Sequence, residues 1–342
     1  MIDRGADVSD AKLPLTRVAT VLRYIHHLQA AGAPVGRLLA HSRIPSVLLE
    51  HPEAALPLST AFRFGELACQ SLGTEHIGLL VGFETSLDEL GPYGRMLQDS
   101  LTLYDYLRKG VSLFNTLITG QLLWLSDHGD ELRFNITTVG DLRLGTYQSH
   151  LETLAVTLTK FREAAGADWF PMTISLGYSS REDLPNVELF SGSHLIRGTG
   201  ETYFTFPRAL LGLHFPVEGS LVEPEIGGSL VPRPLPQDIV ELVQLQIECL
   251  LRDHAIGIDA IAESLTMSRR SLQRSLAKQA LTYSQVLAAT RARLAARWLA
   301  RSEKSIAQIA FDLGYQDASN FTRAFRQQTG ISPQAFRNNL RS

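Results

Sequence analysis

Two stretches near the C-terminal end of the chain repeat one pattern, and this repeat constrains the fold more than any other feature. Residues 258–278 have the sequence IDAIAESLTMSRRSLQRSLAK, and residues 305–337 have the sequence SIAQIAFDLGYQDASNFTRAFRQQTGISPQAFR. In each stretch a short helix with an apolar stripe ends at a tight turn, and a serine or aspartate suited to capping opens a second helix. The pattern predicts two helix-turn-helix units in an all-α region.

The second helix of the first unit carries a polar outer face. Leu272 and Leu276 lie four residues apart and form its predicted buried stripe, and Ser268 is its predicted N-cap. Arginine forks pair with guanine edges or phosphates, and a glutamine amide pairs with adenine, so such a face suits the major groove of DNA. The residues predicted to face outward are Arg269, Arg270, Gln273 and Arg274.

The second unit repeats this arrangement with different residues. Ser305 and Asp317 are the predicted caps of its two helices, and Gly314 is expected to end the first of them. Phe321 and Phe325 lie four residues apart, so we expect them to be buried together. The residues predicted to face outward are Ser319, Asn320, Arg323 and Arg326.

A continuous helix is expected between the two units. Residues 283–300, YSQVLAATRARLAARWLA, consist mainly of strong helix formers. About 17 residues at a rise of 1.5 Å give a rod of roughly 25 Å. Successive major-groove faces on one side of B-DNA lie about 34 Å apart, so one chain can read two adjacent groove segments if the DNA bends. The arginines of this helix are either solvated surface or phosphate contacts: Arg291, Arg293, Arg297 and Arg301.

Charge is distributed unevenly along the chain. The formal net charge is -3, but residues 252–342 hold 14 lysines and arginines against 6 acidic residues, while residues 1–251 hold 18 against 29. A basic C-terminal region joined to an acidic N-terminal region is expected when only the former meets a polyanion. The charge distribution therefore supports nucleic acid as the partner of the helix-turn-helix region.

The region before the repeat predicts an α+β fold. QLLWLSD and ELRFNITTV flank a His-Gly-Asp turn, which is typical of a β-hairpin, and MTISLGY and TYFTFP have the composition of strands. LGPYG at 90–94 is expected to be a turn. Apolar spacings of three and four predict helices over residues 15–31, 59–72, 100–118 and 143–165.

A stretch rich in proline and glycine separates the two regions. Residues 219–237 contain four prolines and three glycines without a helical or strand period, so we expect an interdomain linker. The predicted organisation is an α+β effector-sensing or dimerisation domain at 1–218, the linker at 219–237, and an all-α DNA-binding domain with two helix-turn-helix units at 238–342.

The C-terminal region resembles the DNA-binding domain of AraC/XylS-family transcription regulators. The resemblance is carried by MSRRSLQRSL at 267–276, ARWLA at 296–300 and IAQIAFDLGYQDASNFTRAFRQQTGISPQAFR at 306–337. It implies that the eight outward residues of the two recognition helices contact bases or phosphates. Members of the family commonly have glycine in the turn after the first recognition helix, where this chain has Gln279-Ala280-Leu281, so we expect a differently shaped junction there.

The N-terminal region resembles, more loosely, the arabinose-binding-like sensor region of longer members of the family. LGPYGRMLQDSLTLYDYL at 90–107 and the segments from NVELFSGSHLIRG to TYFTFP carry this resemblance, which implies effector sensing or self-association. Several aromatic residues are either core or candidates for lining an effector pocket: Phe83, Tyr93, Tyr104, Phe114, Trp124, Phe134 and Tyr147.

Residues suited to catalysis or metal binding are sparse. Cys69 and Cys249 are the two cysteines, too few for a thiolate zinc site, and the histidines lack ligand spacing. The sequence has no nucleophile elbow, P-loop or dinucleotide-binding glycine pattern. We therefore expect no enzyme activity, no metal and no cofactor. An enzyme that uses the helix-turn-helix units for targeting, and an N-terminal domain that only dimerises, are the alternatives.

Together these features predict a cytoplasmic, sequence-specific transcription regulator, with activation favoured over repression. No apolar run approaches the roughly 20 residues of a membrane helix, and the first residues do not resemble a signal peptide, so no membrane association is expected. The expected partners are double-stranded promoter DNA, RNA polymerase and an unidentified small-molecule effector, with homodimerisation left open.

Overall fold

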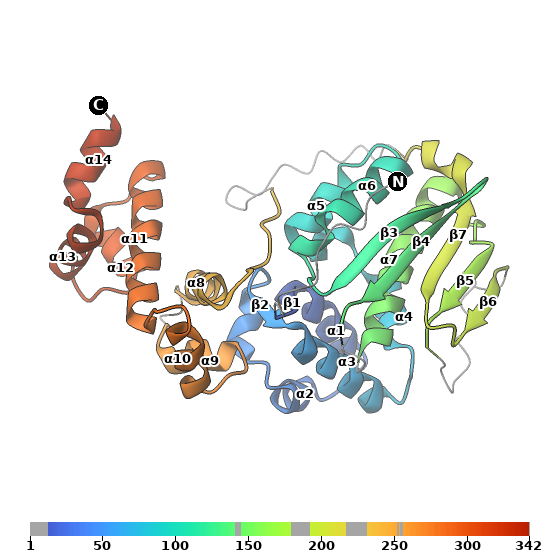
Figure 1. The fold of residues 1–342 in the computed structure, drawn as a ribbon, viewed down its shortest axis with the longest axis horizontal. Coiled ribbons are helices and arrows are strands. Elements are labelled where there is room, and N and C mark those ends of the chain that lie inside the picture. The colour runs from blue at the N-terminus through green and yellow to red at the C-terminus, as the bar shows by residue number, and fades with distance from the viewer. Residues whose placement is uncertain are drawn as a thin grey trace. The chain divides into compact units, whose positions relative to one another are not determined.

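The computed structural model describes residues 13–140, 145–178, 192–216, 231–251, 253 and 256–341. The chain divides into two compact bodies (Figure 1), each described here by itself. The first body comprises Met1–Ile44 and Leu56–Leu235, and the second comprises Pro45–Ala55 and Pro236–Ser342. Most of the predicted linker at 219–237, and residues 186–191 of the loosely similar segment, lie outside the described residues.

The first body is α+β, as its sequence predicts, and helices form most of its N-terminal half. The predicted helices are confirmed, and short helices that the periodicity did not indicate lie between them. The helices are α1 (Val18–Ala30), α2 (Val35–Ser42), α3 (Leu58–Leu72), α4 (Ile77–Glu84), α5 (Gly91–Gln98), α6 (Leu103–Leu113) and α7 (Thr146–Ala165).

A mixed five-stranded sheet follows, in the order β3-β4-β7-β5-β6. The predicted hairpin is confirmed, because β3 pairs antiparallel with β4 and His128 lies opposite Glu131 across a turn that begins at Gly129, whose φ is 81°. β5 pairs in parallel with β6, and β1 and β2 form a separate two-stranded sheet. The strands are β1 (Leu15–Arg17), β2 (Ala55–Pro57), β3 (Gln121–His128), β4 (Glu131–Thr138), β5 (Thr173–Leu176), β6 (His194–Arg197) and β7 (Thr202–Pro207).

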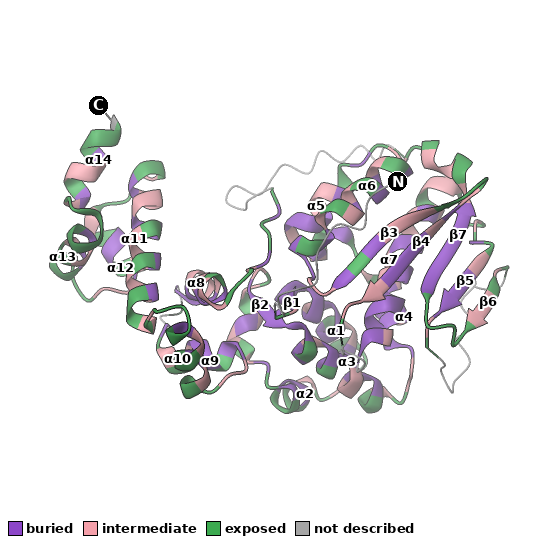
Figure 2. Ribbon diagram, in the orientation of Figure 1, coloured by how far each residue is buried: buried purple, intermediate pink, exposed green. Residues whose placement is uncertain are grey.

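The core of the first body lies between the sheet and α7. The ring of Phe161 on α7 contacts those of Phe204 and Phe206 on β7, with ring centroids 5.2 and 4.7 Å apart, and all three side chains are fully buried. Figure 2 shows burial along nearly all of β7. Aromatic pairs in this edge-to-face arrangement stabilise a core beyond the area that they bury.

The prediction of a turn at residues 90–94 is wrong, because α5 begins there. Pro92 occupies the first turn of α5, where its missing N–H would have no helical partner in any case. Gly94 permits a close approach of the chain, since a Cβ atom at this position would lie 1.7 Å from the carbonyl oxygen of Leu87. Pro92 therefore marks the start of a helix here, and Gly94 allows a close backbone contact, so neither residue indicates a turn.

Burial of His150 on α7 predicts a pH dependence of stability. Desolvation lowers the pKa of His150 to about 4, while the ring nitrogens hydrogen-bond Thr138 and Thr202 at 3.0 and 3.1 Å. Because the folded state favours the neutral ring, this contribution is present above pH 6.5 and is lost as the pH falls from 6.5 towards 4, by about 3 kcal/mol. Urea unfolding between pH 7.5 and 4.5 should show a steeper loss for the unmodified chain than for His150→Gln. If the free energy of unfolding falls equally steeply with pH in both proteins, His150 is not the source of the pH dependence.

The second body consists of helices. The predicted helices of the two units form, and so does a single helix over the stretch predicted to link them. The helices of this body are α8 (Ile239–Leu250), α9 (Ile258–Ser264), α10 (Arg269–Ala277), α11 (Tyr283–Arg301), α12 (Ile306–Asp312), α13 (Ala318–Thr329) and α14 (Pro333–Arg341), the last of which was not predicted.

Residues 45–55 also belong to the second body, although they are distant from its other residues in sequence. They include a 3-10 helix at Ser46–Glu50. The buried amide of Gln246 donates to the carbonyl oxygen of Ala55 at 2.6 Å, and His51 Nε2 lies 2.5 Å from Asp253 Oδ2. Among the described residues of the whole chain, no helix is both long and apolar enough to cross a bilayer.

Candidate DNA-binding surface

The first helix-turn-helix unit consists of α9 and α10. Ile261 and Leu265 from α9 and its end, and Leu272 and Leu276 from α10, are at most 2 % exposed and form the interior of the unit. Ser268 caps α10, because its Oγ accepts a hydrogen bond from the backbone N–H of Ser271 at 3.1 Å. The short apolar runs and the cap thus fix the direction in which α10 presents its other face.

The polar face of α10 lies on the surface. Arg269 forms a weak exposed ion pair with Asp259 at 3.3 Å on the preceding helix. Such a pair contributes little stability, so it does not restrain the guanidinium from reaching a phosphate or base. All four residues predicted to face outward are exposed: Arg269, Arg270, Gln273 and Arg274.

The second unit, α12 and α13, has the same construction. Ser305 and Gln308 form a capping box at the start of α12, and Asp317 Oδ1 accepts from the N–H of Asn320 at 2.7 Å at the start of α13. Phe321 and Phe325 are 1 % exposed with ring centroids 5.8 Å apart. The predicted caps and the predicted aromatic core are therefore confirmed.

The outward face of α13 carries a chain of polar contacts. Asn320 Nδ2 donates to Asp317 Oδ2 at 2.7 Å, and Arg323 Nη2 donates to Asn320 Oδ1 at 3.2 Å. These contacts orient both side chains before any ligand is bound, which lowers the entropy that recognition must overcome. All four residues predicted to face outward are exposed: Ser319, Asn320, Arg323 and Arg326.

α11 joins the two units as one helix of 19 residues, which corresponds to a rod of about 28 Å. Arg291 ties this helix to the second unit, because its Nη2 donates to the carbonyl oxygen of Gly314 at 3.1 Å and its guanidinium lies 4.6 Å from the centroid of the Tyr315 ring. Arg293 and Arg297 form ion pairs with Glu248 on α8. The sequence leaves two roles for four arginines of this helix, solvated surface or phosphate contact. Three of the four have partners within the protein.

Each turn of the two units contains a residue with positive φ. Thr266 and Gly314 follow the first helix of each unit with φ of 55° and 73°, and Ala280 and Gly330 follow the second helix with φ of 56° and 82°. The expectation that the junction at residues 279–281 differs in shape from the glycine-containing turn of the family stays a prediction. The N–H of Leu281 donates to the carbonyl of Leu276 at 3.1 Å and closes the turn without glycine.

Ala280→Gly should stabilise the second body by about 1 kcal/mol. A left-handed backbone costs a residue with a Cβ atom roughly 1–2 kcal/mol, and glycine removes this cost while adding some unfolded-state entropy. Urea unfolding in a Trp124→Phe, Trp169→Phe background, followed through the fluorescence of Trp298 on α11, measures the change. The matched control is Ala277→Gly, within α10, which should destabilise by about 1 kcal/mol. A loss of stability in Ala280→Gly would contradict the inference that the positive φ of Ala280 costs free energy.

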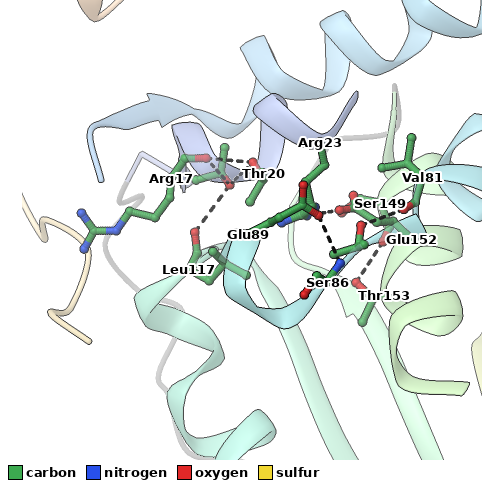
Figure 3. Close-up of polar contacts among 12 residues, drawn as sticks. Arg17, Thr20, Arg23, Val81, Ser86, Glu89, Leu117, Ser149, Glu152 and Thr153 are labelled. Atoms are coloured by element: carbon green, nitrogen blue, oxygen red, sulfur yellow. Dashed lines mark hydrogen bonds and ion pairs between the residues drawn. The ribbon is translucent and has the colours of Figure 1, made fainter. Parts of the chain in front are cut away.

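A buried ion pair lies in the first body and had no signal in the sequence. Arg23 on α1 and Glu152 on α7 point toward one another (Figure 3), with side chains only 5 % and 9 % exposed. α1 begins directly after Arg17, and the Nη2 of Arg17 donates to the carbonyl oxygen of Arg233 at 2.7 Å. Of the aromatic residues proposed for a pocket, Tyr93, Phe114 and Phe134 line a cavity beside Arg23.

In the part of the chain that the structure describes, no three histidine, cysteine or acidic side chains converge as metal ligands. Burial raises the pKa of the Cys69 thiol to about 12, so this cysteine is not a nucleophile at neutral pH.

Two family models match the chain. The arabinose-binding domain of AraC transcription regulators, N-terminal part, matches residues 32–215, and a helix-turn-helix domain matches residues 261–339.

Similar proteins are transcription regulators by name. The ornithine utilization regulator of Pseudomonas aeruginosa is 42% identical over 80 residues, which is 23% of this chain and 24% of that protein. The transcriptional activator RhrA of Rhizobium meliloti is 30% identical over 112 residues, 32% of this chain and 36% of that protein. The matched part of this chain thus spans about a quarter to a third of these two relatives.

Two further comparisons cover nearly the whole length. The regulator VirS of Mycobacterium tuberculosis is 24% identical over 346 residues, which is 94% of this chain and 96% of that protein. The crystal structure of the transcriptional regulator CdpR from Pseudomonas aeruginosa has a TM-score of 0.38 at 22% identity and covers 89% of this chain and 96% of that chain.

Proposed function

Since this chain belongs to the AraC family of transcription regulators, we propose that it binds promoter DNA through both helix-turn-helix units and controls transcription in response to a small molecule held by the first body. The observation that carries the proposal is that arginine and amide side chains are exposed on two helices, α10 and α13, each of which begins at a side-chain N-cap. These groups match the edges of guanine and adenine in the major groove.

Each recognition helix has a defined role in the proposal. α10 and α13 each enter a segment of the major groove, and α11 sets the distance between them. The rod of about 28 Å is shorter than the roughly 34 Å between successive groove faces, so the DNA bends towards the protein or the helices enter at an angle. The proposed contacts are Arg269, Arg270, Gln273 and Arg274 in α10, and Ser319, Asn320, Arg323 and Arg326 in α13.

The other partners follow from the same proposal. A regulator of this kind works in the cytoplasm on double-stranded DNA, and as an activator it would contact RNA polymerase. The names of the relatives favour regulation over catalysis, and the high thiol pKa of Cys69 does not support an enzyme that transfers groups to cysteine. Self-association through the first body is the remaining alternative to ligand sensing, and sedimentation of the full chain distinguishes a monomer from a dimer.

A gel shift with fragments upstream of the gene and its neighbours tests the proposal. One fragment should bind at least about 10³-fold more tightly than coding sequence of equal length, as specific regulators do at physiological salt. The affinity should also fall with rising salt concentration, by a slope of about 0.9 per phosphate neutralised. Equal affinity for all fragments would contradict a sequence-specific role.

A further inference from the structure

Three side chains on the outward face of α13 form one continuous hydrogen-bond relay, which consists of Asp317, Asn320 and Arg323. Asp317 is the N-cap of the helix, and its Oδ1 accepts from the backbone N–H of Asn320 at 2.7 Å. Its Oδ2 accepts from Asn320 Nδ2 at 2.7 Å, and Asn320 Oδ1 accepts from Arg323 Nη2 at 3.2 Å. The relay therefore connects the start of the helix to the guanidinium of an exposed arginine.

The backbone that carries the relay is held by burial on the opposite face of α13. Phe321 and Phe325 are each 1 % exposed, and the cap at Asp317 fixes the first turn. An arginine side chain has much rotamer freedom to lose when it binds a ligand, and a hydrogen bond that already restricts it reduces this loss. The relay thus orients Arg323 before DNA is bound.

The relay engages both ends of the Asn320 amide. An asparagine that reads adenine uses the same two groups, since its oxygen accepts from N6 of the base and its nitrogen donates to N7. In Asn320 the oxygen already accepts from Arg323, and the nitrogen already donates to Asp317. A direct contact with adenine would compete with these two hydrogen bonds, whereas a role in holding Arg323 uses them as they stand.

Arg323 keeps the other N–H groups of its guanidinium for a ligand, and all of them are donors. Among the four bases only guanine presents two neighbouring acceptors, O6 and N7, in the major groove, whereas adenine places an amino donor beside its N7. We propose that Arg323 reads a guanine in the DNA segment bound by α13, and that Asn320 is a positioning residue that acts on this base through Arg323. The inference rests on the proposed function and refines it, because Asn320 then contributes to specificity without a base contact of its own.

The base analogue 7-deazaguanine, which lacks the N7 acceptor, tests the base assignment on the full chain. It replaces each guanine of the preferred promoter fragment in turn, and gel shifts at fixed salt measure the affinity. One replacement should weaken binding of the unmodified chain by about tenfold, because a hydrogen bond to a charged donor is lost. The same replacement should have no further effect on Arg323→Ala. If no guanine shows this coupling to Arg323, the base assignment is overturned.

Asn320→Ala tests the positioning role. The variant removes the side chain that holds Arg323 but keeps the backbone N–H that Asp317 caps, so the start of α13 is retained. The preference for guanine over 7-deazaguanine should largely disappear, whereas the affinity for coding sequence should change little, because phosphate contacts do not depend on the base. The matched control is Gln328→Ala, which removes an exposed amide from the other end of α13 and should keep the preference.

A charge-conserving swap separates positioning from direct reading. In Asp317→Asn with Asn320→Asp, the first position still carries a favourable N-cap and the second carries a carboxylate that accepts from Arg323, while the net charge of the relay is unchanged. The preference for guanine over 7-deazaguanine should therefore return. An asparagine amide at 320 that reads a base directly is absent from both variants. A preference that stays lost in the swap, or that is unchanged in Asn320→Ala, would overturn the positioning role.

The inference and the proposed function fail in distinguishable ways. If no fragment binds better than coding sequence, the sequence-specific role is contradicted and the inference falls with it. If a preferred fragment exists but no guanine in it is coupled to Arg323 and Asn320, the inference alone is overturned.

Discussion

Replacing Arg270 and Arg323 together by alanine will weaken binding to the preferred promoter fragment by about 10²–10⁴-fold. Each residue is exposed near the start or middle of its recognition helix, and each good base contact contributes about 1–3 kcal/mol. The two residues lie in separate helix-turn-helix units, so their effects should add. Gel shifts at fixed salt with the preferred fragment and with coding sequence measure the loss.

Measuring the affinity for coding sequence as well distinguishes base contacts from phosphate contacts. If the arginines read bases, the preferred fragment loses far more affinity than coding sequence, whereas phosphate contacts would lower both equally. Arg108→Ala with Arg208→Ala is the matched control, because it removes the same charge from exposed positions of the first body. Equal losses in the test and control variants would show that the effect arises from net charge and would count against the assigned helices.

The helix-turn-helix units could be predicted from the sequence because the signals that define them are local. A cap such as Ser268 lies within three residues of the N–H that it binds, and Phe321 and Phe325 lie four residues apart on one helix face. The exposure of the outward residues follows from this geometry once the buried stripe is known. The left-handed turn at Ala280 was missed because no glycine marked it.

The cavity could not be predicted in the same way. Arg23 and Glu152 are 129 residues apart in sequence, and their pairing depends on how α1 packs near α7. From sequence alone, a single arginine within an apolar helix stripe is usually predicted to be exposed, because arginine is rarely buried unless it is paired. The pairing of β5 with β6, and the inclusion of residues 45–55 in the second body, likewise arise from contacts between distant segments.

Phe325→Ala is expected to destabilise the second body by about 3–5 kcal/mol, the usual cost of truncating a fully buried phenylalanine. Phe325 is 1 % exposed and contacts two rings, those of Phe321 at 5.8 Å and Phe336 on α14 at 5.6 Å between centroids. The variant removes the ring that joins α13 to α14, so the second recognition helix loses its support. DNA affinity should fall with stability even though no outward residue is changed.

Urea unfolding with a local probe separates this effect from changes in the first body. The chain has three tryptophans, Trp124, Trp169 and Trp298, of which only Trp298 lies in the second body. In a Trp124→Phe, Trp169→Phe background, fluorescence therefore reports on the second body alone. The matched control is Phe311→Ala on α12, where the side chain is 66% exposed and the loss should stay below about 1 kcal/mol. Because both variants remove one phenyl ring from the same body, a similar loss in the two would mean that burial of Phe325 does not hold the second unit together.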